Sequence, residues 1–167
     1  MQQPAFFMQF RNDDSYFGNF ELLKKRIVSF LAANDTPEVL WTRVEQWLEH
    51  EIYGTDKVVL SHFDTPFEKR VMQLLLKRNH PIMLFTYNTP ENSSLNKLNI
   101  SPSTPNILVL KYRPLHNEWR SKQTDMKRMA VINLADEFIT IGVTSDRNIL
   151  TILDLYQQSP EKPHRVL

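Results

Sequence analysis

A short polar turn carries the residue types best suited to acid–base chemistry. Ser61, His62, Asp64 and Glu68 follow directly after the apolar run Val58-Val59-Leu60. An imidazole near a carboxylate can form a hydrogen-bonded acid–base pair or half of a metal site, and Glu68 or Asp64 could serve as the catalytic acid or base of an enzyme. No second cluster of His, Asp or Glu stands at ligand spacing, so we expect no metal and regard exposed turn residues as the simpler account of His62 and Asp64.

Two further polar groups stand where apolar segments end. Asn34, Asp35 and Thr36 follow the run Arg26 to Ala32, and Thr144 with Ser145 follows Ile139 to Val143. Such side chains at the carboxyl ends of strands can hydrogen-bond the ribose or phosphate of a nucleotide. A turn followed by a helix N-cap explains the same residues without a ligand. Both interpretations stay open.

A basic loop provides the third candidate surface. Between Lys111 and Arg128 the sequence has six basic and two acidic residues, and Trp119 lies among them. Cations interleaved with aromatic rings suit single-stranded nucleic acid, because the cations contact phosphates and the rings stack on bases. We therefore include Arg113 and Arg120 among the candidate ligand-binding residues, beside the simpler possibility of a solvated loop.

The elements that would position these residues form a strand–helix–strand unit between Lys57 and Phe85. Thr65 is predicted as N-cap, Pro66 as the first helical residue and Glu68 as the partner in a capping box. Phe67 and the apolar residues after it recur at helical spacing, and His80-Pro81 ends the helix before the apolar run Ile82 to Phe85. A unit of this kind normally joins parallel strands and binds ligands at their carboxyl ends, so we expect a ligand first at the polar turn from Ser61 to Glu68.

The rest of the chain repeats this alternation. We expect strands at 26–32, 106–112, 139–143 and 164–167, and a turn leading into a short helix at 16–23. Helices are expected from Thr36 as N-cap to Gly54, from Asp125 to Glu137, and after Asp146. Residues 1–15 are expected to form an arm or edge strand, and the polar segment 86–105 a lid or surface excursion. The fold class is thus α/β, a three-layer Rossmann-like sandwich with a mostly parallel five- to six-stranded sheet.

Composition limits the classes of function. The 167 residues, 41% of them apolar, suit one domain spanning 1–167, and no apolar run is long enough for a membrane span or signal peptide. The chain has no cysteine and a net charge of +1, so we expect a cytoplasmic protein whose overall field does not attract nucleic acid. Its three glycines exclude the Gly-rich phosphate loops of dinucleotide-binding and P-loop proteins, and no cofactor is expected.

The order of segments resembles the Rossmann-like domain of the DNA-processing protein A (DprA/Smf) group. The wider superfamily includes the cytokinin-activating phosphoribohydrolases. The resemblance covers Tyr16 to Leu167 and rests on Gly18-Asn19 before the first strand, Val58-Val59-Leu60-Ser61, and Glu68-Lys69 in the next helix. It implies a Rossmann-like sheet with an anion or single-stranded DNA bound near the first turn.

This sequence departs from the pattern at the two turns. A Gly-Ser-Arg turn is replaced by residues 31–35, Leu-Ala-Ala-Asn-Asp, and a Ser-Gly turn by Ser61-His62-Phe63-Asp64. The Pro-Gly-Gly turn of the phosphoribohydrolases is also absent, although Glu68 lies roughly where their catalytic Glu would be. The usual mode of phosphate binding is therefore in question.

Our main hypothesis is a binding module, with no enzymatic activity favoured. It would hold a nucleotide or single-stranded nucleic acid at the carboxyl ends of the strands, through the candidate residues Asn34, Asp35, Thr36, Ser61, His62, Asp64, Arg113, Arg120, Thr144 and Ser145. One alternative is a nucleotide N-glycosidic-bond hydrolase that uses Glu68 or Asp64. Another is a degenerate domain that serves protein–protein interaction, and a homo-oligomer is compatible with all three. No membrane partner is expected.

Overall fold

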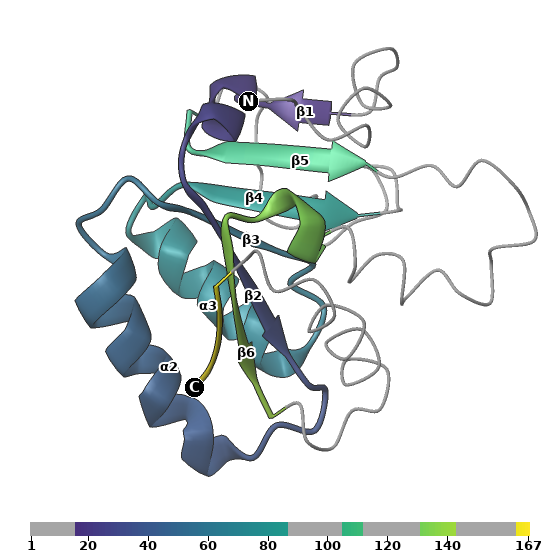
Figure 1. Ribbon diagram of the computed structural model, residues 1–167. Helices are drawn as coiled ribbons and strands as arrows, with labels where there is room; N and C mark the ends of the chain where they lie inside the picture. Colours follow the sequence, from purple (N-terminus) through teal and green to yellow (C-terminus); the bar gives the residue numbers. More distant parts are fainter. Residues whose placement is uncertain (1–15, 87–104, 112–130, 143–162) are drawn as a thin grey trace, which may run out of the picture.

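The fold is built on a single seven-stranded sheet (Figure 1). The computed structural model describes residues 16–86, 105–111, 131–142 and 163–167. In the sheet the strands lie in the order β1-β5-β4-β3-β2-β6-β7. Their bounds are β1 Tyr16–Gly18, β2 Ile27–Ala32, β3 Val58–Ser61, β4 Ile82–Thr86, β5 Ile107–Lys111, β6 Glu137–Ile141 and β7 His164–Val166.

Within the described part of the chain, six strands are parallel and β1 runs antiparallel to β5. The predicted fold class, a Rossmann-like sandwich on a mostly parallel sheet, is confirmed. The count exceeds the expected five to six because residues 16–18 form β1 instead of the predicted turn. The segment 164–167 was predicted as a closing edge strand, and His164–Val166 is indeed the outermost strand beside β6.

Helical segments connect the strands. They are the 3-10 helices η1 (Phe20–Lys24) and η2 (Glu38–Leu40), the α-helices α2 (Trp41–Trp47) and α3 (Pro66–Lys77), and the π-helical segment η3 (Leu48–Ile52). Residues 131–134 form a further helical turn before β6. The connection from β2 to β3 contains α2, and the connection from β3 to β4 contains α3, as the predicted strand–helix–strand unit requires.

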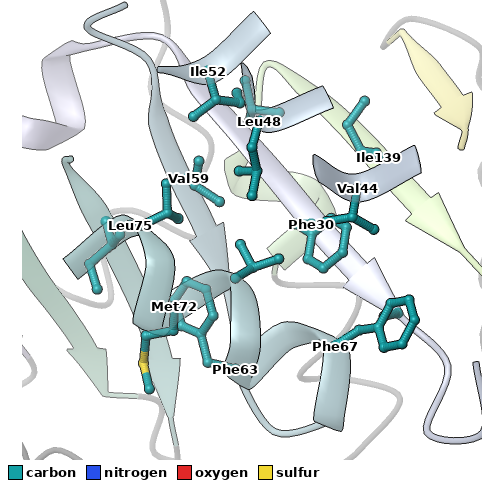
Figure 2. Packing of buried hydrophobic residues seen from close by; sticks show 14 of the residues in the cluster. Phe30, Val44, Leu48, Ile52, Val59, Phe63, Phe67, Met72, Leu75 and Ile139 are labelled. Carbon is teal, nitrogen blue, oxygen red and sulfur yellow. The ribbon is translucent and has the colours of Figure 1, made fainter. Parts of the chain in front are cut away.

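One face of the sheet is covered by α2 and α3. Figure 2 shows this cluster, in which Val44, Leu48 and Leu75 of the helices lie over Phe30 and other strand residues. Phe30 also stacks on Trp47, with 5.3 Å between the ring centroids. Burying an aliphatic or aromatic side chain of this kind stabilises a fold by about 1.5–3 kcal/mol, so this layer fixes both helices on the sheet.

The opposite face has its own apolar cluster. Leu22 of η1 and Val131, Ile132 and Leu134 of the helical turn pack there against strand residues such as Leu31. Because both faces of the sheet are covered, successive strand residues are buried irrespective of the side to which they point, as all six residues of β2 show. This explains why the sequence of each central strand is mostly apolar instead of alternating between apolar and polar residues.

Helix α3 starts as its sequence predicts. The Thr65 side chain accepts a hydrogen bond from the Glu68 N–H, the Glu68 carboxylate accepts one from the Thr65 N–H, and Pro66 is the first helical residue. Its predicted apolar face is buried at Phe67, Val71 and Leu75. The helix ends at Lys77, and the His80 N–H then donates to the Leu75 carbonyl before β4 begins.

Two predicted helix boundaries are wrong. Thr36 does not cap the second helix: its hydroxyl donates to the Ala33 carbonyl at 2.6 Å, and Pro37 precedes η2 without a side-chain cap. The helix predicted from Asp125 to Glu137 ends earlier, because its last helical residue is Leu134 and Phe138 already belongs to β6. At the second boundary, Phe138 was predicted on the apolar face of the helix, but it is buried as a residue of β6.

Gly18-Asn19, part of the sequence resemblance, joins β1 to the rest of the sheet. Gly18 has φ +104°, and a Cβ there would lie 2.2 Å from the Ile107 carbonyl oxygen, so a larger residue could not approach β5 this closely. Asn19 accepts from the Glu21 N–H at the start of η1 and donates to the Pro105 carbonyl. The pair therefore fixes the chain reversal that precedes β2.

Candidate nucleic-acid interface at the carboxyl edge

The parallel strands bring several predicted site residues to one edge of the sheet. β2 is the first of the parallel strands; β3, β4 and β5 follow on one side of it, whereas β6 lies on its other side. Successive strands are thus added on one side of β2 as far as β5 and then on its other side from β6 onward. The strand order therefore reverses between β2 and β6, although these two strands are parallel. In open α/β sheets, ligands bind in the crevice at such a point, outside the carboxyl ends of the strands.

The loop after β2 lies at this point. Asn34 and Asp35 are exposed there, and Thr36 is partly buried. The Thr36 hydroxyl holds the loop by donating to the Ala33 carbonyl, and the Ala33 N–H donates to the Ile141 carbonyl of β6 at 3.1 Å. The two exposed side chains are thus carried by a loop that is fixed to both β2 and β6.

The loop after β6 approaches the same place through Gly142. This glycine has φ +69°, and a Cβ on it would lie 2.4 Å from the Thr36 hydroxyl oxygen. The beginnings of the two loops are therefore in contact. Thr144 and Ser145, which follow Gly142 directly, lie outside the described residues.

The turn after β3 is largely buried. Ser61 is fully buried, and its hydroxyl accepts a hydrogen bond from the Phe63 N–H at 3.1 Å. His62 is only 6% exposed; its ring lies edge-on to Phe85, and its Nδ1 is 3.2 Å from the Phe85 carbonyl oxygen. The prediction that His62 is an exposed turn residue was wrong, because the ring packs against β4. Asp64 is exposed, as predicted.

Phe63 takes the left-handed conformation that glycine usually supplies in such turns. It has φ 52°, and its side chain is only 1% exposed, beside Met72 in the core under α3 (Figure 2). For a residue with a Cβ this conformation costs roughly 1–2 kcal/mol, which the burial of the ring offsets. The turn therefore has the left-handed backbone that glycine favours, with a phenylalanine at that position.

Glu68 joins the ends of β2 and β3. Its carboxylate accepts hydrogen bonds from the backbone N–H groups of Ala32 (3.2 Å), Asp64 (3.0 Å) and Thr65 (3.1 Å), and its side chain is 3% exposed. Burial raises the pKa of the Glu68 carboxyl, and the three backbone amides act in the opposite direction. The sequence predicted the contact with Thr65 but not the one with Ala32, since only the fold brings β2 near the helix.

The basic loop is attached to the same edge. β5 runs parallel to β4 and pairs Lys111 with Thr86, so the chain leaves the sheet at its carboxyl edge before entering residues 112–130. Arg113 and Arg120, the candidate phosphate ligands, lie outside the described residues. The topology thus places the start of the loop, but not those two side chains, at the same edge of the sheet, with β4 and β3 between it and β2.

A cleft of about 430 Å³ lies at the other end of the strands. Its lining includes Glu51, Glu137 and Arg165. The charges are balanced by ion pairs, because Arg165 pairs with Glu51 and Glu137 with Arg26. Since these charges neutralise one another, we do not assign the candidate nucleic-acid interface to this cleft.

Within the described residues, no group of three or more His, Cys, Asp or Glu side chains could hold a metal ion. None of the helices in that part of the chain is both long and apolar enough to cross a membrane.

Solved structures have a similar fold. DNA processing protein A from Helicobacter pylori, described for its single-stranded DNA binding mode, superimposes with a TM-score of 0.62 over 99% of this chain and 78% of its own. The fold is that of DNA processing protein A. The same protein from Streptococcus pneumoniae gives a TM-score of 0.53 over 90% of this chain and 62% of its own.

Both DprA structures are 14% identical to this chain in sequence. The resemblance read from the sequence is thus confirmed for the fold. No protein-family model matches the sequence, and no curated protein matches it either. The likeness therefore lies in the path of the backbone and not in the sequence.

Proposed function

We propose that this chain is a nucleic-acid-binding module that holds single-stranded DNA at the carboxyl edge of its sheet. The proposal is carried by the switch point between β2 and β6, where the exposed Asn34 and Asp35 stand at the reversal of strand order. The fold shared with the DprA of Helicobacter pylori, which binds single-stranded DNA, supports nucleic acid as the ligand class.

The exposed residues of the edge suit contacts with bases and sugars. Asn34 can donate and accept hydrogen bonds, and the carboxylates of Asp35 and Asp64 can accept them from the amino groups of bases. Ser61 and His62 are buried, so a direct contact with DNA would require this turn to open. We therefore assign direct contacts to the exposed residues and regard Ser61 and His62 as residues that shape the turn.

Phosphate contacts are assigned to Arg113 and Arg120. The described part of the edge contributes carboxylates, and a DNA backbone needs cations nearby. The sequence provides them in the loop after β5, which leaves the sheet at this edge. Thr144 and Ser145, after β6, complete the proposed set as hydrogen-bonding groups.

Fluorescence anisotropy of a labelled thymidine oligonucleotide tests this function. Replacing both arginines, Arg113→Ala with Arg120→Ala, should weaken binding at least about tenfold and reduce the slope of log affinity against log salt by roughly 1.4, or 0.7 for each lost phosphate contact. The matched control is Arg26→Ala with Arg78→Ala, which removes two charges at the opposite edge and should leave the affinity nearly unchanged.

Three outcomes would contradict the proposal. They are no binding by the native protein, equal losses in the two double variants, and a loss confined to the control. The Glu68 hydrolase alternative receives less support, because the Glu68 carboxylate is buried and bonded to three backbone amides.

A further inference from the structure

The sheet opens between β2 and β3 before the strands end. Their pairing stops at Ser29–Leu60, whereas β2 remains paired with β6 as far as Ala32–Ile141. The last residues of β2 therefore have no β3 residue opposite them in the ladder. The Ala32 N–H donates to the Glu68 carboxylate and not to a carbonyl of β3.

Three amides surround this carboxylate from two separate elements. The Asp64 and Thr65 N–H groups belong to the turn before α3, and the Ala32 N–H belongs to β2. Convergent backbone N–H groups of this kind are the usual means by which proteins hold oxyanions. The position is enclosed as well, since Ala32 is fully buried and Glu68 and Thr65 nearly so.

We propose that Ala32, Asp64 and Thr65 form an oxyanion site that the chain occupies with its own carboxylate, that of Glu68. The carboxylate holds the place that a free carboxylate or phosphate would otherwise take, and it closes the gap between β2 and β3. Glu68 is thus a positioning residue for the carboxyl edge. No external anion can use these three amides unless Glu68 leaves them.

This site has a consequence for the ligand, which rests on the proposed function. DNA phosphates cannot bind at the β2–β3 gap, so they must be held elsewhere along the edge. The exposed carboxylates nearby, Asp35 and Asp64, likewise favour bases or sugars over phosphates at this part of the molecule.

Acetate rescue tests the proposal. The substitution Glu68→Ala removes a CH2 group and a carboxylate, which together have the shape of acetate, and leaves the three amides without their acceptor. We expect a lowered Tm that added acetate raises by about 2–4 °C relative to chloride at equal ionic strength, with saturation. If Glu68→Ala does not fold in chloride, folding in acetate would support the proposal, and failure in both salts would overturn it.

Two variants serve as controls. Glu51→Ala makes the same deletion at an exposed ion pair with Arg165, and its Tm should not respond specifically to acetate. Glu68→Gln fills the site with an amide and should also be unresponsive. Equal responses to acetate and chloride in Glu68→Ala, or an acetate response in either control, would overturn the proposal. Because no nucleic acid is used, failure of the DNA-binding proposal would leave this result unaffected.

Discussion

The two neighbours of β2 are joined to it in different ways at the carboxyl edge. On the β6 side, backbone pairing continues to Ala32–Ile141, and Thr36 then lies against Gly142. On the β3 side, pairing stops at Ser29–Leu60, and the Glu68 carboxylate fills the gap. Polar residues at equivalent strand ends therefore differ in their exposure to solvent. After β2, Asn34 and Asp35 are exposed and Thr36 is partly buried, whereas most of the polar residues after β3 hold the turn together.

The largest effect should come from the turn on the β3 side. Phe63→Ala should lower the free energy of unfolding by about 3–5 kcal/mol, because a buried aromatic side chain is lost. Phe63→Gly loses the same ring but removes the cost of φ 52°, so it should be more stable than Phe63→Ala by roughly 1 kcal/mol. Urea denaturation of both variants measures the difference.

Phe67 provides the matched control for this turn. It is also buried, but it belongs to the first turn of α3, where glycine is less favourable than alanine by roughly 0.5–1 kcal/mol. The order of stability should therefore reverse between the two positions. If glycine were the less stable replacement at both, the left-handed backbone at Phe63 would not contribute measurable strain.

A substitution on the β6 side should lower the free energy of unfolding by less. Gly142→Ala should lower it by about 2–3 kcal/mol, because the substitution adds a Cβ both at φ +69° and against Thr36. Gly54→Ala is the control for the backbone alone, since Gly54 has φ +78° and nothing within 4 Å of the added Cβ. Gly54→Ala should lower the free energy of unfolding by about 1–2 kcal/mol.

Combining Gly142→Ala with Thr36→Ala sharpens this result. The double variant should be less destabilised than the sum of the single variants, by about 1 kcal/mol, because the smaller residue at 36 relieves part of the clash. Chemical denaturation of the four proteins in the cycle gives the coupling. Strict additivity would contradict the contact between the two loops.

The two sides also differ in how far the sequence alone predicted them. Local patterns were sufficient for the fold class and for the capping box of Thr65 and Glu68, because those depend on residue spacing and near neighbours. The burial of His62 was missed, since the β4 residue Phe85 that covers it is distant in sequence. The Ala32–Glu68 bond was missed for the same reason. The absence of glycine from this turn was the available signal that side chains, and not a phosphate, fill the space.

The smallest expected effect is a pH dependence at the β3 side. Burial raises the pKa of Glu68 above its ordinary value of 4.5, so the folded state binds this proton more tightly than the unfolded state. The resulting stabilisation is fully present below pH 4.5 and is lost as the pH rises through the folded-state pKa. Glu68→Gln cannot titrate. The free energy of unfolding of the native protein minus that of Glu68→Gln should therefore decrease as the pH rises from 4.5 towards 7.

Other titrating groups should cancel in this difference, because both proteins contain them. His80 and His164 have pKa values lowered by burial, and their contributions are lost as the pH falls. The Glu51 pKa is lowered by its hydrogen bond to Arg165, and its contribution is likewise lost as the pH falls. Urea denaturation of both proteins at a series of pH values gives the difference. An increase with pH would mean that the amides of Ala32, Asp64 and Thr65 outweigh burial, and that the β2–β3 gap holds its carboxylate more strongly in the charged form.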